Sequence, residues 1–107
     1  MTVHCEGTDQ CKDDQSIGDR CDATTCIFNC EGTKACEGNA RINTVANNVI
    51  LMCKGEGACS GNFKFTPTSS NARYCCEGTD ACKDGTFGGT RCDSCDTCQA
   101  KSSHMNQ

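Results

Sequence analysis

The chain has 107 residues, among them 14 Cys, 4 Phe, 1 Tyr and no Trp, and its formal net charge at pH 7 is −4. So many cysteines with so few aromatic side chains exclude a thick hydrophobic core and indicate a disulfide scaffold formed in an oxidising compartment. Basic and acidic residues are intermixed and no run of about 18 apolar residues occurs, so we expect neither a nucleic-acid partner nor a membrane-spanning helix.

The N-terminal segment Met1–Cys5 lacks the charged start and apolar stretch of a secretory signal peptide. Because the cysteines are even in number and regularly spaced, we expect a mature domain, or a fragment of a longer chain, that is secreted and extracellular. The alternative is a cytosolic thiol protein.

A seven-residue motif bounded by two cysteines occurs four times. It reads CEGTDQC from Cys5, CEGTKAC from Cys30, CKGEGAC from Cys53 and CEGTDAC from Cys76. The motif starts are 25, 23 and 23 residues apart, which predicts stacked structural repeats rather than unrelated disulfide loops.

We divide residues 3–98 into four coils of a single domain, at about 3–28, 29–52, 53–75 and 76–98. The first coil is irregular after its motif and resembles a cap, as terminal repeats often do. The tail, 99–107, is polar and without pattern, and we expect it to be disordered.

Coils two and three predict two short strands each. Apolar and basic residues alternate in 40–42 and in 63–65, as in a half-buried strand. This places Ala40, Ile42, Phe63 and Phe65 inward and Arg41 and Lys64 outward. A second strand follows at Val49–Leu51, after a turn that we assign to Asn47 and Asn48, and to Ser70 and Asn71 in the next coil, because Asn tolerates a left-handed backbone.

The fourth coil is a near copy of the first. Residues 5–22 and 76–93 are identical at 12 of 18 positions. Near-identical ends suit head-to-tail contact between copies, and such a translational contact yields a filament. The alternative is a monomer in which a duplication left two similar capping coils.

Together these patterns predict an all-β fold, a short β-solenoid of about four coils stapled by disulfides. Two residues before each motif cysteine stand apolar or aromatic side chains, as a buried stack requires: Val3, Phe28, Leu51 and Tyr74. Just after the cysteine the column reads Glu6, Glu31, Lys54, Glu77, and a later column reads Asp9, Lys34, Gly57, Asp80, so opposite charges become neighbours. The glycine of the motif implies a tight corner.

The simplest disulfide pairing lies within each motif: Cys5–Cys11, Cys30–Cys36, Cys53–Cys59 and Cys76–Cys82. Cys21 and Cys26 are expected to pair in coil one, and Cys75, Cys92, Cys95 and Cys98 to form two further bonds. A ladder of bonds between successive coils is the alternative, since spacing does not exclude it.

Metal sites are the alternative use of some of these cysteines and of several aspartates. The overlapping CxxC spacings of Cys92, Cys95 and Cys98 occur in zinc sites, but no paired histidines accompany them. Asp9, Asp13, Asp14, Asp80 and Asp84 offer oxygen ligands for calcium, but the EF-hand order is missing and Asp is common in turns. We therefore predict no metal and no cofactor.

The repeated, disulfide-stapled coils loosely resemble the cysteine-rich antifreeze β-helices of insects. That resemblance implies paired threonines repeated along a flat face. Here Thr8, Thr33 and Thr79 form one column that Glu56 interrupts, and no second threonine column accompanies it.

No catalytic constellation emerges, so we predict a non-enzymatic extracellular structural or adhesive module. Its partner is expected to be a second copy, head to tail, or an extracellular glycan or protein. The alternatives are a secreted cysteine-rich effector or inhibitor, binding through loops such as Asp13–Asp19 or Thr66–Ser70, and an ice-binding protein.

Overall fold

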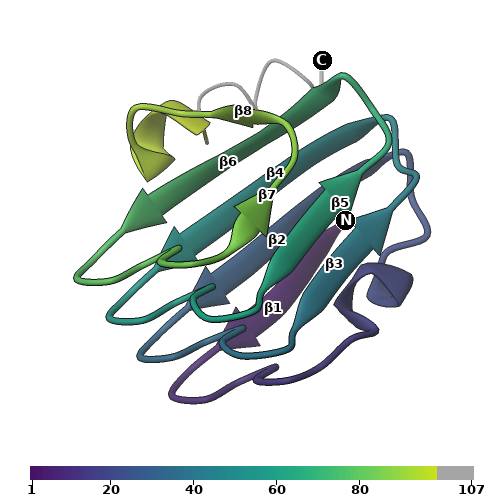
Figure 1. Cartoon of the computed structure of the whole chain (residues 1–107). Coiled ribbons are helices and arrows are strands. Elements are labelled where there is room, and N and C mark those ends of the chain that lie inside the picture. The colour runs from purple at the N-terminus through teal and green to yellow at the C-terminus, as the bar shows by residue number, and fades with distance from the viewer. Residues whose placement is uncertain (99–107) are drawn as a thin grey trace.

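Parallel strands stacked along one axis form the framework of the molecule (Figure 1). The computed structural model describes residues 1–98, so the predicted disordered tail lies outside the described residues. The elements are β1 (Thr2–Glu6), the 3₁₀ turn η1 (Ile17–Arg20), β2 (Thr25–Glu31), β3 (Arg41–Thr44), β4 (Asn48–Lys54), β5 (Lys64–Pro67), β6 (Asn71–Glu77), β7 (Thr86–Phe87) and β8 (Thr90–Arg91).

Two parallel sheets face each other across a thin core. One has the strand order β1-β2-β4-β6-β8 and the other β3-β5-β7, so each middle coil gives one strand to each sheet. Phe28 lies opposite Leu51, and Leu51 opposite Tyr74, which gives a repeat of 23 residues. The predicted disulfide-stapled β-solenoid of about four coils is confirmed.

The inward side chains are those that the sequence patterns predicted. Val3, Phe28 and Leu51 are buried and in register, and Tyr74, half-buried, ends the column. The second sheet buries Ala40, Ile42, Phe63 and Phe65, whereas Arg41 and Lys64 are exposed. Because alternate side chains of an extended chain point to opposite faces, the stretches 40–42 and 63–65 each contribute only two residues to the core.

Aromatic rings close the C-terminal end of the core. The Tyr74 and Phe87 rings stack with their centroids 4.7 Å apart, and Phe87 lies 5.4 Å from Phe63. These contacts are made where the fourth coil shortens, since β7 and β8 have two residues each. Short edge strands of this kind offer little backbone for further pairing.

Coil one departs from the repeat as the cap prediction implied. Instead of a strand it places η1 beside β3, so close that a Cβ on Gly18 would lie 2.1 Å from the Asn43 carbonyl oxygen. Only glycine fits at this approach. The N-terminal edge of the three-stranded sheet is therefore covered by η1.

Seven disulfide bonds join the fourteen cysteines, and no free cysteine remains. The pairs are Cys5–Cys11, Cys21–Cys26, Cys30–Cys36, Cys53–Cys59, Cys75–Cys95, Cys76–Cys82 and Cys92–Cys98. Bonds within the motifs connect the two ends of one corner, so the ladder of bonds between successive coils is not formed.

The prediction of left-handed asparagines was wrong. Asn48 and Asn71 begin β4 and β6, lie opposite each other, and do not have positive φ. Positive φ is found in the cysteine corners instead. The strands begin one residue earlier than expected because Asn48 already joins the ladder, where its backbone N–H donates to the Thr24 carbonyl oxygen at 3.0 Å.

Within residues 1–98, no helix is both long enough and apolar enough to cross a membrane.

Candidate functional site

The four cysteine motifs form four superposed corners that line one side of the solenoid. In each corner, alternate residues have positive φ; in coil one these are Gly7, Asp9, Cys11 and Asp13. Hydrogen bonds from Gln10 N to Gly7 O (3.4 Å) and from Lys12 N to Asp9 O (3.2 Å) close successive four-residue turns. A left-handed third residue is what a type II turn requires. The disulfide Cys5–Cys11 spans these turns.

Backbone hydrogen bonds join each corner to the next with a fixed direction. The N–H groups of Gly7, Asp9 and Asp13 donate to carbonyl oxygens of coil two, at 2.8, 2.9 and 2.9 Å. A single bond runs the other way, from Cys36 N to Gln10 O at 2.9 Å. The same three forward bonds and one return bond recur between coils two and three and between coils three and four.

This direction leaves the two ends of the solenoid with complementary groups. Among residues 1–98, no backbone carbonyl accepts from the N–H groups of the last corner at Gly78, Asp80 and Asp84. No backbone N–H of the same residues donates to the carbonyls of the first corner at Glu6, Thr8 and Lys12. The two ends therefore present opposite halves of the pattern that joins the coils internally.

The charge columns run through these corners in the predicted register. Glu6 lies opposite Glu31, Glu31 opposite Lys54, and Lys54 opposite Glu77. The cations of the columns, Lys34 and Lys54, lie in the middle coils, so both end corners carry only acidic side chains in these positions. Each end of the solenoid is therefore negative.

A small polar network lies on the outer face of β1 and β2. His4 Nδ1 is 2.8 Å from Glu6 Oε1, and Asn29 Nδ2 donates to the same oxygen at 2.7 Å. The hydrogen bond from His4 lowers the pKa of Glu6 below its ordinary value, with a smaller contribution from Asn29 and opposed by desolvation. The side chains of both His4 and Glu6 are exposed.

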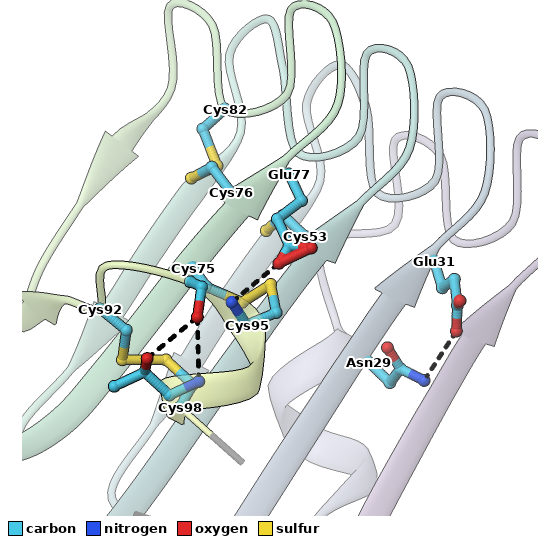
Figure 2. The surroundings of a disulfide bond; sticks show 12 residues. Asn29, Glu31, Cys53, Cys75, Cys76, Glu77, Cys82, Cys92, Cys95 and Cys98 are labelled. Atoms are coloured by element: carbon cyan, nitrogen blue, oxygen red, sulfur yellow. Dashed lines mark hydrogen bonds between the residues drawn. A yellow bond between two sulfur atoms is a disulfide. The ribbon is translucent and has the colours of Figure 1, made fainter. Parts of the chain in front are cut away.

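The cysteines after the fourth corner form a disulfide-locked clip on the outer face of the larger sheet. Residues 95–98 make one helical turn, held to β6 by Cys75–Cys95 and to the preceding chain by Cys92–Cys98 (Figure 2). The backbone N–H of Cys95 donates to Glu77 Oε2 at 2.8 Å. The clip covers Ile50 and Met52, which would otherwise be exposed apolar side chains.

Within residues 1–98, the side chains weighed as metal ligands have other roles in this geometry. Zinc binding needs thiolates, but Cys92, Cys95 and Cys98 are bound in disulfides. Asp9, Asp13, Asp80 and Asp84 are left-handed turn residues, in line with the preference of Asp for turns, while Asp14 is paired with Arg20. The sulfurs of Cys5, Cys11 and Cys36 lie within 4.8 Å of one another because two disulfides are stacked.

The threonine column and the two predicted binding loops lie in different parts of the molecule. The threonine column that Glu56 interrupts lies in the corners, since Asp9 N donates to Thr33 O and Gly57 N to Thr79 O, and not on a strand face. The segment Thr66–Ser70 begins inside β5. The segment Asp13–Asp19 reaches an open hollow of about 530 Å³ between 18–24 and 43–47.

Sequence reasoning missed two groups of residues: Arg20, which contacts the Cys5–Cys11 disulfide, and the outer apolar pair beneath the clip. The apolar run at 49–52 carried a signal for that pair, because a strand with one solvated face alternates and this one does not.

In comparisons with protein-family models, curated proteins and solved structures, nothing matches this chain. The fold defines its class as a cysteine-rich, disulfide-stapled β-solenoid.

Proposed function

We propose that the chain is a non-enzymatic, extracellular structural module whose solenoid stacks head to tail on further copies. Seven disulfides suit an oxidising environment, and the four within the motifs stiffen the corners of a protein with a thin core. A stiff module with complementary ends is a suitable building block for a filament. Contacts that repeat by translation do not close on themselves, so further copies can be added at each end.

The observation that carries the proposal is the match between the two end corners. The last corner offers three N–H groups and the first corner offers three carbonyls at the equivalent positions of a nearly identical motif. A copy stacked in register would form the same three forward bonds as the internal junctions. Unpaired backbone edges of this kind template further pairing.

The contact between copies is confined to the corners and the adjoining strand ends. At the N-terminal end η1 occupies the edge of the smaller sheet, and at the C-terminal end β8 pairs with Arg73 and Tyr74. The stacking surfaces are therefore residues 4–14 of one copy and residues 75–84 of the next. Such a small contact predicts reversible association rather than a permanent dimer.

Charge opposes this contact. In register, Glu77 would face Glu6, Asp80 would face Asp9 and Asp84 would face Asp13, each about 5 Å apart, the usual strand spacing. Like charges at this separation repel, and salt screens the repulsion between exposed groups. Association should therefore increase with ionic strength. A purely hydrophobic contact would show the same dependence, so a charge-reversal variant is needed to distinguish the two explanations.

Light scattering of the oxidised protein at several concentrations and salt levels tests the proposal. The decisive variant is Asp9→Lys. The equivalent position of coil two is already a lysine, Lys34, and both positions have a left-handed φ of about 60°. It places a cation opposite Asp80 of the next copy and should strengthen association at low salt.

The matched control is Glu56→Lys, which changes net charge equally but lies exposed in the middle of the stack. It should leave association as in the parent chain. A protein that stays monomeric at millimolar concentration in high salt, with and without Asp9→Lys, would contradict the proposal.

A further inference from the structure

The guanidinium of Arg20 lies directly on the disulfide of the first corner. Its Nη1 is 3.2 Å from Cys11 Sγ and 3.9 Å from Cys5 Sγ. Its Nη2 is ion-paired with Asp14 Oδ2, which holds the planar group with Nη1 toward the sulfurs. Among the hydrogen bonds of residues 1–98, this is the one place where a cation donates to a disulfide sulfur.

The fourth corner supplies an internal comparison. Cys76–Cys82 has the same sequence separation of 6 and a nearly identical motif, and Arg91 occupies the position equivalent to Arg20. Arg91, however, lies in β8 opposite Tyr74 and donates to no sulfur of residues 1–98. The two disulfides thus differ in the presence of a cation.

We propose that Cys5–Cys11 is a redox-labile modification site that reacts with low-molecular-weight thiols such as glutathione. The thiolate of the reductant attacks Sγ of Cys11, the half-exposed partner; a mixed disulfide forms at Cys11, the Cys5–Cys11 bond breaks, and Cys5 leaves as a thiolate. A second thiolate attacks the reductant's sulfur in the mixed disulfide and releases the Cys11 thiolate. Two thiols are oxidised to one disulfide, and one protein disulfide is reduced to two thiolates.

The physical reason is the charge that develops on each leaving sulfur. A guanidinium within 4 Å stabilises the thiolate over the thiol, and a more stable thiolate is a better leaving group. Asp14 offsets part of this effect, so we expect Cys5–Cys11 to be reduced about ten times faster than Cys76–Cys82.

Exposure alone predicts the opposite order of reduction. Cys5 is buried, with 2% of its surface exposed, and only Cys11 of that pair is half-exposed. In the fourth corner both Cys76 and Cys82 are half-exposed. If access to solvent decided reactivity, Cys76–Cys82 would be reduced first. The order of reduction therefore separates the electrostatic effect from simple accessibility.

The proposal is independent of the proposed function, although reduction would loosen one of the two stacking surfaces. Without its bond, the first corner would keep three forward hydrogen bonds to coil two, whereas the corners of coils two and three would keep their disulfides. Reduction is therefore a local event at the N-terminal end of the solenoid, and the remaining coils should stay folded.

The test is timed reduction of the native oxidised protein by reduced glutathione or dithiothreitol, quenched with acid and an alkylating reagent, with the labelled cysteines mapped by mass spectrometry. Cys5 and Cys11 should be labelled about ten times faster than Cys76 and Cys82. Arg20→Gln should slow that labelling to the rate of the fourth corner or below it, and Arg20→Lys should retain part of the advantage. Arg91→Gln is the matched control and should change neither rate.

Equal rates for the two corners in the parent protein would overturn the proposal. So would faster reduction in Arg20→Gln, because loss of packing around coil one accelerates reduction whereas loss of the cation slows it. Circular dichroism before reduction verifies that each variant is folded.

Discussion

Gly32 faces the backbone of Gly7 so closely that a Cβ on Gly32 would lie 2.6 Å from the Gly7 carbonyl oxygen. The same contact recurs from Gly55 to Gly32 and from Gly78 to Gly55, at 2.6 and 2.7 Å. Glycine is required here for two reasons, the positive φ of the corner and the approach of the preceding coil. The spacing of the whole stack therefore depends on residues that have no side chain.

This contact predicts that Gly32→Ala destabilises the fold much more than Gly7→Ala. Both residues have a positive φ, 131° and 119°, so both variants strain the backbone. Only Gly32→Ala also drives a methyl group into another coil, since the nearest atom to a Cβ at Gly7 is Cγ of the flexible Gln10 side chain at 3.1 Å. Forced overpacking costs about 1–3 kcal/mol. Urea unfolding with the disulfides intact should show this difference; equal losses would mean that strain alone matters.

Leu51 should be the most sensitive position in the apolar column. It is fully buried between Phe28 and Tyr74, whereas Arg41 is exposed on the other sheet. Leu51→Asp places an unpaired charge in the core and should abolish folding, while Arg41→Asp should change the free energy of unfolding by no more than about 0.5 kcal/mol. Soluble yield and circular dichroism measure both. Similar tolerance of the two variants would contradict the assigned burial.

The strand phase and the columns were predictable because one period governs them. With 23 residues per coil, a match at one position fixes the neighbour of every other position in the strand, as Glu31 opposite Lys54 shows. Burial then follows from the alternation of side chains, as for Ile42 and Phe65. In coils two and three the alternation within each strand and the stacking of the coils assign the same residues to the core. The sequence therefore predicts strand phase and burial correctly there.

The corners were less predictable because stacking overrides local preference. Lys34 is left-handed although a lysine side chain disfavours that region, and the bonds from each corner to the next require it. Asp9 and Asp80, in the same column, tolerate the region better. A signal was present, since Gly57 occupies the same column. That column indicates left-handed residues in the corners and not at Asn48 and Asn71.

Sequence similarity does not fix the conformation where the chain context differs. Arg20 and Arg91 occupy equivalent positions in the two near copies, yet Arg20 ends η1 and Arg91 ends β8. Coil one has β3 beside it, against which η1 packs, whereas coil four turns back early at Gly88 and Gly89. The conformation of the segment that contains the arginine therefore depends on a contact with the coil that follows. The spacing of residues within the coil does not reveal that contact.

Oxidation of all fourteen cysteines predicts a specific mass. Seven disulfides remove 14 hydrogens, so the native protein should be lighter than the fully reduced protein by about 14 Da. Intact-mass measurement with and without reductant tests this, and alkylation of the native protein without reductant should add nothing. A labelled native cysteine or retained zinc would contradict the disulfide pattern.

Glu6 should titrate below its ordinary range because His4 stabilises the carboxylate. His4→Ala should raise its pKa toward the ordinary value, and side-chain carboxyl signals in an NMR titration measure the shift. A pKa lowered in the folded state adds stability above the unfolded value, about 4.3, and that contribution disappears as the pH falls through the folded value. Lys12→Ala, which removes a different exposed ion pair, should leave the Glu6 titration unchanged.

The disulfide-locked clip should contribute more stability than a corner disulfide, because it closes a longer loop. Cys75 and Cys95 are 20 residues apart, whereas Cys76 and Cys82 are 6 apart. In the chain-entropy account these bonds contribute about 3 and about 2 kcal/mol respectively. The double variant Cys75→Ser and Cys95→Ser should also release 92–98 and uncover Ile50 and Met52, which the clip now buries. Increased amide exchange at 92–98, together with binding of a hydrophobic dye, should distinguish this variant from Cys76→Ser with Cys82→Ser, in which the clip stays in place. Equal dye binding by the two double variants would show that the clip does not protect that apolar surface.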